Sequence, residues 1–269
     1  LIKNIRNNLT RHDIITSDGC KVSWKFINQM YEIDKQNKLR LCHKLKKTHL
    51  NPKGQLAMRV RLATQVFSHS VAASMSTCIE AKLLPPDALD TVDFLQKMDK
   101  LFDLLNSRRK IADKLQRNAL PNPASGTSVL PDLLQLKSWI EGWSFDGVPN
   151  TNRISSHWGL IATIQSIVDL SQELFEDGFS YVCTSRFNED CLENFFSVIR
   201  SKSGWSDNPT PIQFCAAFKN AVVLGALESS SSKSSNCEND TDLSLLTATD
   251  SSNDVTTLLP REQSVYANC

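Results

Sequence analysis

The sequence predicts a mainly α-helical fold, and three observations support this. Apolar residues recur three and four positions apart over most of the first 220 residues. Glycine and proline interrupt these stretches only at a few points, where we expect turns. Only residues 179–184 have the composition of a short β-strand. With 269 residues, the chain is long enough for one large or two medium domains.

Each expected helix is bounded by capping or helix-breaking residues. The longest runs from Gln55 to Leu83 without Gly or Pro, and Pro85-Pro86 end it. Asp87 is expected to cap the next helix, which continues to about Arg109, and Ser155 or Ser156 to cap a later one. Trp139 and Trp143 are expected to anchor the core. Further helices are expected at residues 1–12, 24–33, 132–141, 157–176, 188–200 and 211–227.

Composition excludes several classes of protein. The net charge is only +1, so the chain as a whole has no electrostatic attraction to nucleic acid. No apolar run is long enough to span a membrane. The eight cysteines contain no C-x-x-C pair, which favours free thiols in a reducing compartment over a zinc site. Residues 229–269 are rich in Ser, Asn, Asp and Thr, and we expect a disordered tail there.

Three polar patterns each allow a structural and a functional interpretation. Residues 38–47 are strongly basic. They can form a solvated surface, or they can form a face that binds phosphate groups. Asp99, Asp103 and Asn106 share one helix face beside Phe102; such a face is often merely hydrated. A carboxylate, an amide and a ring can also recognise guanine together. Asp190 and Glu193 can cap a helix, or Glu193 can bind a metal beside the apolar stripe of Leu192, Phe196 and Ile199.

Three ordered blocks resemble P-element-type DNA transposases, which include the THAP-domain transposase relatives of animals. Residues 192–214, beginning Leu-Glu-Asn-Phe-Phe-Ser, resemble the closing block of that family. Residues 1–9 resemble the segment that follows its second catalytic Asp, and residues 58–68 resemble a core block of its GTP-binding insertion domain. The resemblance covers roughly residues 1–225, and three blocks in one order are far more specific than any one alone.

The resemblance implies a helical GTP-binding insertion domain within an RNase H-like (α/β) catalytic domain, of which this chain holds the later part. Residues 1–34 would be an RNase H-like segment, residues 35–187 the insertion, residues 188–228 the closing RNase H-like helices and residues 229–269 the tail. The chain starts at Leu1, inside a helical pattern, so we expect a fragment of a longer protein.

The resemblance also implies specific site residues. Glu193 would be the third of three catalytic acids that bind two Mg²⁺ ions. The nucleotide contacts would be Lys44, Arg59, Val60, Ser68, Phe102, Asp103, Asn106 and Asp190. The chain has no G-x-x-x-x-G-K-[ST] loop, so helices rather than a phosphate-cradling loop would hold GTP. The nucleotide would act as a cofactor for binding transposon DNA, and we expect no GTP hydrolysis.

The remaining expectations follow from the same resemblance. The partners would be GTP and transposon-end DNA, the full-length protein would form a homo-oligomer, and it would be nuclear. Because the other two acids would precede Leu1, we expect no catalysis by this chain alone. The alternative is a domesticated, catalytically inactive helical module that binds DNA or protein.

Overall fold

The computed structural model describes residues 1–126, 128–149, 154–202, 204 and 208–223. It divides the chain into two compact units, Leu1–Glu189 and Asp190–Cys269. The predicted tail, residues 229–269, lies outside the described residues. Among the described residues, no helix has both the length and the apolar character needed to cross a bilayer.

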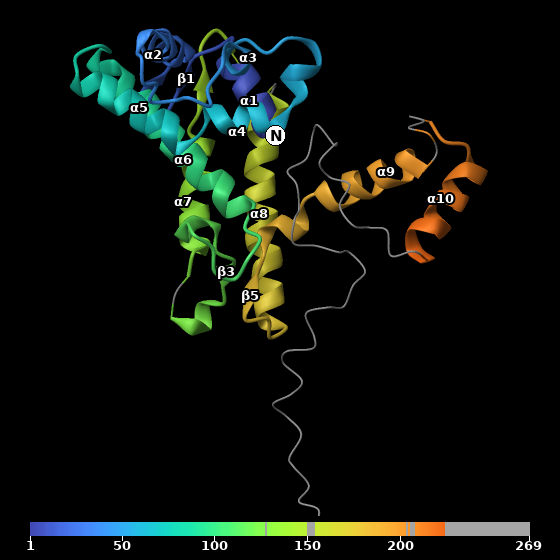
Figure 1. The fold of residues 1–269 in the computed structure, drawn as a ribbon. Coiled ribbons are helices and arrows are strands. Elements are labelled where there is room, and N and C mark those ends of the chain that lie inside the picture. Colours follow the sequence, from blue (N-terminus) through green and yellow to red (C-terminus); the bar gives the residue numbers. More distant parts are fainter. Residues whose placement is uncertain (127, 150–153, 203, 205–207, 224–269) are drawn as a thin grey trace, which may run out of the picture. The chain divides into compact units, whose positions relative to one another are not determined.

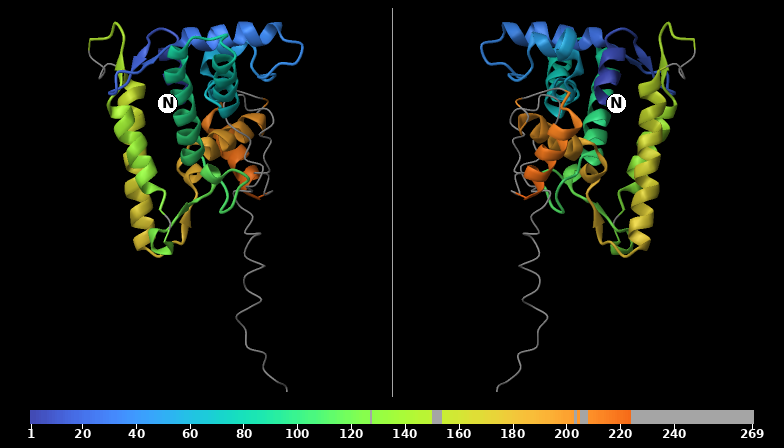
Figure 2. Two further views of the ribbon diagram at one scale, coloured as in Figure 1. Left: turned by 90° about the vertical axis from the view of Figure 1, so that its left-hand side faces the viewer. Right: turned by 90° about the vertical axis from the view of Figure 1, so that its right-hand side faces the viewer.

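The first unit is built from helices around one core, as predicted. Its α-helices are α1 (Ile2–Leu9), α2 (Trp24–Gln36), α3 (Lys47–Leu50), α4 (Val60–Val66), α5 (His69–Glu80), α6 (Leu89–Leu105), α7 (Leu130–Glu141) and α8 (Ser155–Glu176). Short 3₁₀ helices are η1 (Gly54–Met58), η2 (Pro86–Ala88), η3 (Leu115–Arg117), η4 (Pro123–Ser125) and η6 (Thr184–Phe187). Figures 1 and 2 show the short elements α1–α5 gathered at one end of α6 and α8.

Five two-residue strands close the two ends of this unit. β1 (Ile14–Ile15) pairs antiparallel with both β2 (Lys21–Val22) and β4 (Ser144–Phe145), so that Ile14 faces Val22 and Phe145. β3 (Leu120–Pro121) pairs antiparallel with β5 (Tyr181–Val182) at the other end of α8 (Figure 1). Only β5 was predicted. The other four strands are too short to show an alternating sequence pattern. Each of them buries one apolar residue, which stabilises the pairing.

The aromatic core of the first unit lies where α6 meets α7 and α8. Phe94 of α6 packs on Trp139 and Trp143, with ring centroids 5.6 and 5.3 Å away, and Trp143 packs edge-to-face on Trp139. His157 of α8 completes the group, and its Nε2 is 2.7 Å from the carbonyl oxygen of Ile140. The prediction that the two tryptophans anchor the core is therefore confirmed.

Two helix starts differ from the prediction. Asp87 lies within η2, and α6 begins after Ala88, which caps it without a side-chain hydrogen bond. Ile154 precedes α8, and Ser156 is buried where it accepts a hydrogen bond from the amide of Asn8 at 3.0 Å. The serine hydroxyl is engaged with α1, so it is not used as a cap. At α6, a 3₁₀ turn that begins with proline replaces the expected cap. At α8, the contact with α1 replaces it.

The second unit is described as two helices, α9 (Asp190–Lys202) and α10 (Pro211–Val223). Val198 and Ile199 are buried against Ala217 and Ala221, with Phe195 and Phe214 at the edge. The predicted apolar stripe of this helix was therefore partly wrong. Ile199 is buried, but Leu192 and Phe196 are 59% and 44% exposed, because α10 covers the neighbouring face.

Candidate functional site

The predicted base-recognition residues lie together in the last turn of α6. Asp103 is 2% exposed, and Phe102 and Asn106 beside it are half-buried. Asn106 ends the helix, where its backbone N–H donates to the carbonyl oxygen of Asp103 at 3.3 Å. The amide of Asn188 donates to the side-chain oxygen of Asn106 at 3.5 Å. The last turn of α6 and its C-cap therefore carry a carboxylate, an amide and an aromatic ring.

The carboxylate of Asp103 is bound by two cations that the sequence analysis did not single out. Lys114 Nζ is 2.6 Å from Asp103 Oδ2 and 2.6 Å from Asp99 Oδ2, and Arg117 Nε is 2.9 Å from Asp103 Oδ1. Burial lowers the pKa of Lys114, but hydrogen bonds to the two carboxylates outweigh it and raise that pKa above its ordinary value. The sequence did contain a signal: five basic residues between positions 108 and 117 directly follow the acidic helix face.

A reciprocal pair of hydrogen bonds holds the end of α6. Ser107 N–H donates to Thr184 Oγ1 at 2.9 Å, and Thr184 N–H donates to Ser107 Oγ at 3.0 Å. The Thr184 hydroxyl in turn donates to the carbonyl oxygen of Leu104 at 2.7 Å. Both side chains are buried, and 77 residues separate them in the sequence. This clamp fixes the turn that follows Asn106.

Replacing Thr184 by valine tests this clamp. Valine has nearly the same shape, so the change removes the hydroxyl and leaves Ser107 N–H and the Leu104 carbonyl without that partner. We expect the free energy of unfolding in urea to fall by about 1–3 kcal/mol. Thr163→Val is the matched control, because the Thr163 hydroxyl donates only to a carbonyl of its own helix. Equal stability of the two variants would contradict a role for the clamp.

The predicted phosphate-side residues lie at the starts of two helices. Arg59 precedes α4 and Val60 is its first residue, while Ser68 precedes α5. The sequence predicted one unbroken helix from Gln55 to Leu83, and that prediction was wrong. The chain leaves helical geometry at Phe67 and Ser68, where the Phe67 ring is buried and packs on Phe94 of α6, 5.9 Å between centroids. The break supplies free backbone N–H groups at Ser68, where an anion is favoured.

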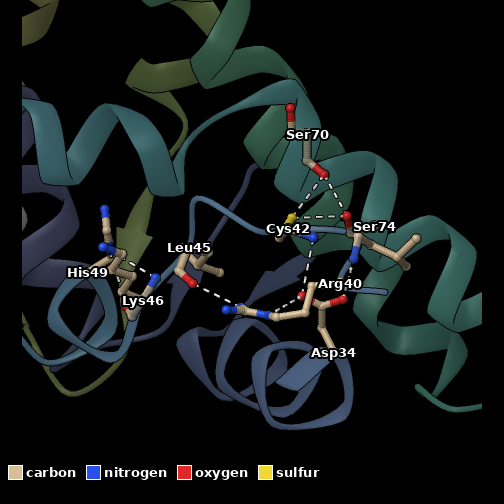
Figure 3. Close-up of polar contacts among 9 residues, drawn as sticks. Asp34, Arg40, Cys42, Leu45, Lys46, His49, Ser70 and Ser74 are labelled. Carbon is tan, nitrogen blue, oxygen red and sulfur yellow. Dashed lines mark hydrogen bonds and ion pairs between the residues drawn. The ribbon is translucent and has the colours of Figure 1, made fainter. Parts of the chain in front are cut away.

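Lys44 belongs to a loop that is organised around one buried carboxylate. Asp34, at 0% exposure, accepts hydrogen bonds from the backbone N–H groups of Leu41 at 2.6 Å and Cys42 at 3.2 Å, and from Arg40 Nε at 3.2 Å. Figure 3 shows Arg40 reaching onward to the carbonyl oxygen of Leu45, at 2.9 Å. Cys42 and Leu45 are buried on either side of Lys44, which is exposed. The basic segment is therefore a fixed loop with its ammonium groups turned to solvent.

Asp190 and Glu193 both lie in the first turn of α9, within the second unit. Acidic side chains there are favoured by the positive end of the helix. Among the described residues, no group of three or more His, Cys, Asp or Glu side chains is placed to hold a metal ion. These two carboxylates alone do not make the donor set that a pair of catalytic metals needs. The donors present in the described chain therefore do not fit a complete catalytic centre.

Two family profiles match the chain. The family described as TNP-like, GTP-binding insertion domain matches residues 1–118. The family described as TNP-like, RNase H C-terminal domain matches residues 185–219. The two matches fall in the order that the resemblance of the sequence blocks implied.

Known proteins agree with these profiles. The Transposable element P transposase of Drosophila melanogaster is 28% identical over 225 residues, which is 83% of this chain and 29% of that protein. The human DNA transposase THAP9 is 25% identical over 225 residues, 82% of this chain and 25% of that protein. The chain therefore spans between a quarter and a third of these relatives.

A solved structure shares the fold. The Drosophila P element transposase strand transfer complex superposes with a TM-score of 0.71 at 26% identity, over 82% of this chain and 49% of that chain. The mainly helical first unit and the helical second unit are consistent with an insertion domain followed by RNase H-like helices. The chain is therefore homologous to the P-element-type DNA transposases, and it carries their GTP-binding insertion domain and the C-terminal part of their RNase H-like domain.

Proposed function

We propose that this chain binds GTP as a cofactor that is not hydrolysed, in a cut-and-paste DNA transposase of the P-element type. The observation that carries the proposal is the end of α6, which holds Phe102, Asp103 and Asn106 within the region that matches the GTP-binding profile. The Asp103 carboxylate would accept the ring N–H and the amino group of guanine, Asn106 would serve its other edge, and Phe102 would cover its face.

The phosphates would lie toward the starts of α4 and α5. Arg59 and Lys44 would supply positive charge, while Val60 and Ser68 would contribute backbone N–H groups and a hydroxyl. Phe67, which directly precedes Ser68, packs on Phe94 of α6, and this places the start of α5 beside the helix that bears Asp103. Asp190 is proposed as a further nucleotide contact on the resemblance alone.

Glu193 would be the third metal-binding acid of the full-length enzyme, with two further acids supplied from outside this chain. Glu193 would be one of the acids that hold Mg²⁺ in the loaded enzyme, and the metal would supply charge for phosphodiester cleavage. Glu193 lies one turn after Asp190 on α9, so nucleotide contact at Asp190 would bear directly on the orientation of the catalytic acid. The partners would be transposon-end DNA and further copies of the full-length protein, in the nucleus.

We also propose the domain division that the sequence suggested. The division of the chain into compact units after Glu189 supports a boundary near residue 187 between the insertion and the closing RNase H-like helices. The earlier boundary at residue 34 rests on the resemblance of residues 1–9. Ile5 and Leu9 of that segment belong to the core of the first unit, and the GTP-binding profile also includes them.

The test is a calorimetric titration of the chain with GTP and with ATP, for the natural protein, Asp103→Ala and Lys44→Met. The natural protein should prefer GTP, and Asp103→Ala should lose most of that preference, since a donor pair left without its acceptor costs about 1–3 kcal/mol. Lys44→Met should lower the affinity for both nucleotides alike, because the charge of Lys44 would meet the phosphates and not the base. No GTP binding by the natural protein would contradict the proposal and favour the domesticated, GTP-independent module.

A further inference from the structure

Both oxygens of the carboxylate that would recognise guanine are already hydrogen-bonded in this structure. Each of its two oxygens receives a donor from a side chain of the segment that follows α6: Lys114 Nζ on Oδ2 and Arg117 Nε on Oδ1. Those are the same two oxygens that the adjacent N–H groups of a guanine base require. Asp103 is 2% exposed, so a base cannot reach it while both cations stay in place.

The two cations are themselves far more exposed than the carboxylate they cover. The side chains of Lys114 and Arg117 are 39% and 57% exposed, so they can swing into solvent without unfolding the helix. The segment that carries them is pinned on both sides. Arg109 and Asn118 form an isolated β-bridge through their backbones. The side-chain oxygen of Asn118 also accepts a hydrogen bond from the backbone N–H of Ala112 at 2.7 Å. Movement of the two side chains therefore does not require movement of the whole segment.

Building on the proposed function, we infer that Lys114 and Arg117 form a latch that occupies the base-recognition carboxylate of Asp103 until guanine displaces them. The cost of releasing the latch lowers the apparent affinity for GTP, because only the open fraction of the chain binds the base. ATP does not need Asp103, so its binding leaves the latch closed.

The experiment measures GTP and ATP affinity by calorimetry at pH 8 for the natural chain, Lys114→Gln and Arg117→Gln. Glutamine keeps most of the length of these side chains and removes the charge. Lys100→Gln is the matched control, because Lys100 lies on α6 with Asp103 but forms its salt bridge with Asp132, at 2.9 Å. Thermal melting confirms that each variant is folded.

A latch predicts that either variant binds GTP on the order of tenfold more tightly, with ATP affinity unchanged and Lys100→Gln like the natural chain. Unchanged or weaker GTP binding by both variants, beside measurable binding by the natural chain, overturns the latch and leaves the proposed function standing. The absence of GTP binding in every protein overturns both.

Discussion

Replacing Asp103 by asparagine is expected to change the preferred nucleotide from GTP to xanthosine triphosphate (XTP). Xanthine has a carbonyl oxygen where guanine has its amino group. An asparagine presents one carbonyl acceptor to the ring N–H and one amide donor to that new carbonyl, whereas the natural carboxylate presents two acceptors. We expect at least about tenfold loss for GTP and a comparable gain for XTP, the scale of one unpaired polar contact on each side.

Competition between labelled GTP and unlabelled XTP measures the exchange. Asp99→Asn is the matched control, because Asp99 lies one turn earlier on α6 and shares Lys114 with Asp103. The control loosens the same cation without altering the acceptor at residue 103, so it should keep the preference for GTP. A loss of all nucleotide binding in Asp103→Asn with no gain for XTP would indicate that this carboxylate supports the fold and does not meet the base.

Asp34→Ala is expected to cause the largest loss of stability in the first unit. The change leaves the backbone N–H groups of Leu41 and Cys42 without their acceptor and frees Arg40 from its ion pair. A buried donor without a partner costs about 1–3 kcal/mol, so we expect the free energy of unfolding to fall by roughly 2–5 kcal/mol. The loop that carries Lys44 should lose its shape first.

Urea denaturation and hydrogen exchange of residues 40–50 measure this effect. Asp34→Asn keeps one acceptor oxygen, so its free energy of unfolding should fall by about half as much. Lys35→Ala is the surface control, since Lys35 is exposed and forms a salt bridge with the equally exposed Glu32 at 3.8 Å. If Asp34→Ala is as stable as Lys35→Ala, water replaces the carboxylate without loss of stability. The apolar residues of the loop would then be what holds it in place.

The long helices could be predicted from the sequence because their periodicity is continuous. α2, α7, α8 and α10 each lie within a few residues of the expected bounds. The break at Phe67 and Ser68 could not be predicted, since nothing in that segment disfavours a helix locally. At the break Phe67 packs on the Phe94 ring, 27 positions away, and a contact at that separation leaves no periodic trace in the sequence.

The candidate site could be predicted only in part from the sequence. Spacing placed Asp99, Asp103 and Asn106 on one face beside Phe102, and in the structure all four residues belong to the second half of α6 or its C-cap. Their actual neighbours were missed, because Lys114 and Arg117 lie in a loop whose path back to the helix is set by the pairing of Arg109 with Asn118. Spacing rules cover residues of one element, whereas loop geometry decides which charges meet across elements.

The pairing of distant segments in the first unit bears on how this protein can be shortened. The region matched by the GTP-binding profile ends at residue 118, yet Ile14 pairs with Phe145, and Phe94 stacks on two tryptophans at positions 139 and 143. A chain cut at residue 118 would expose that aromatic surface to water and would invite aggregation. An independently soluble GTP-binding domain should therefore be expressed through residue 189, where the first unit ends.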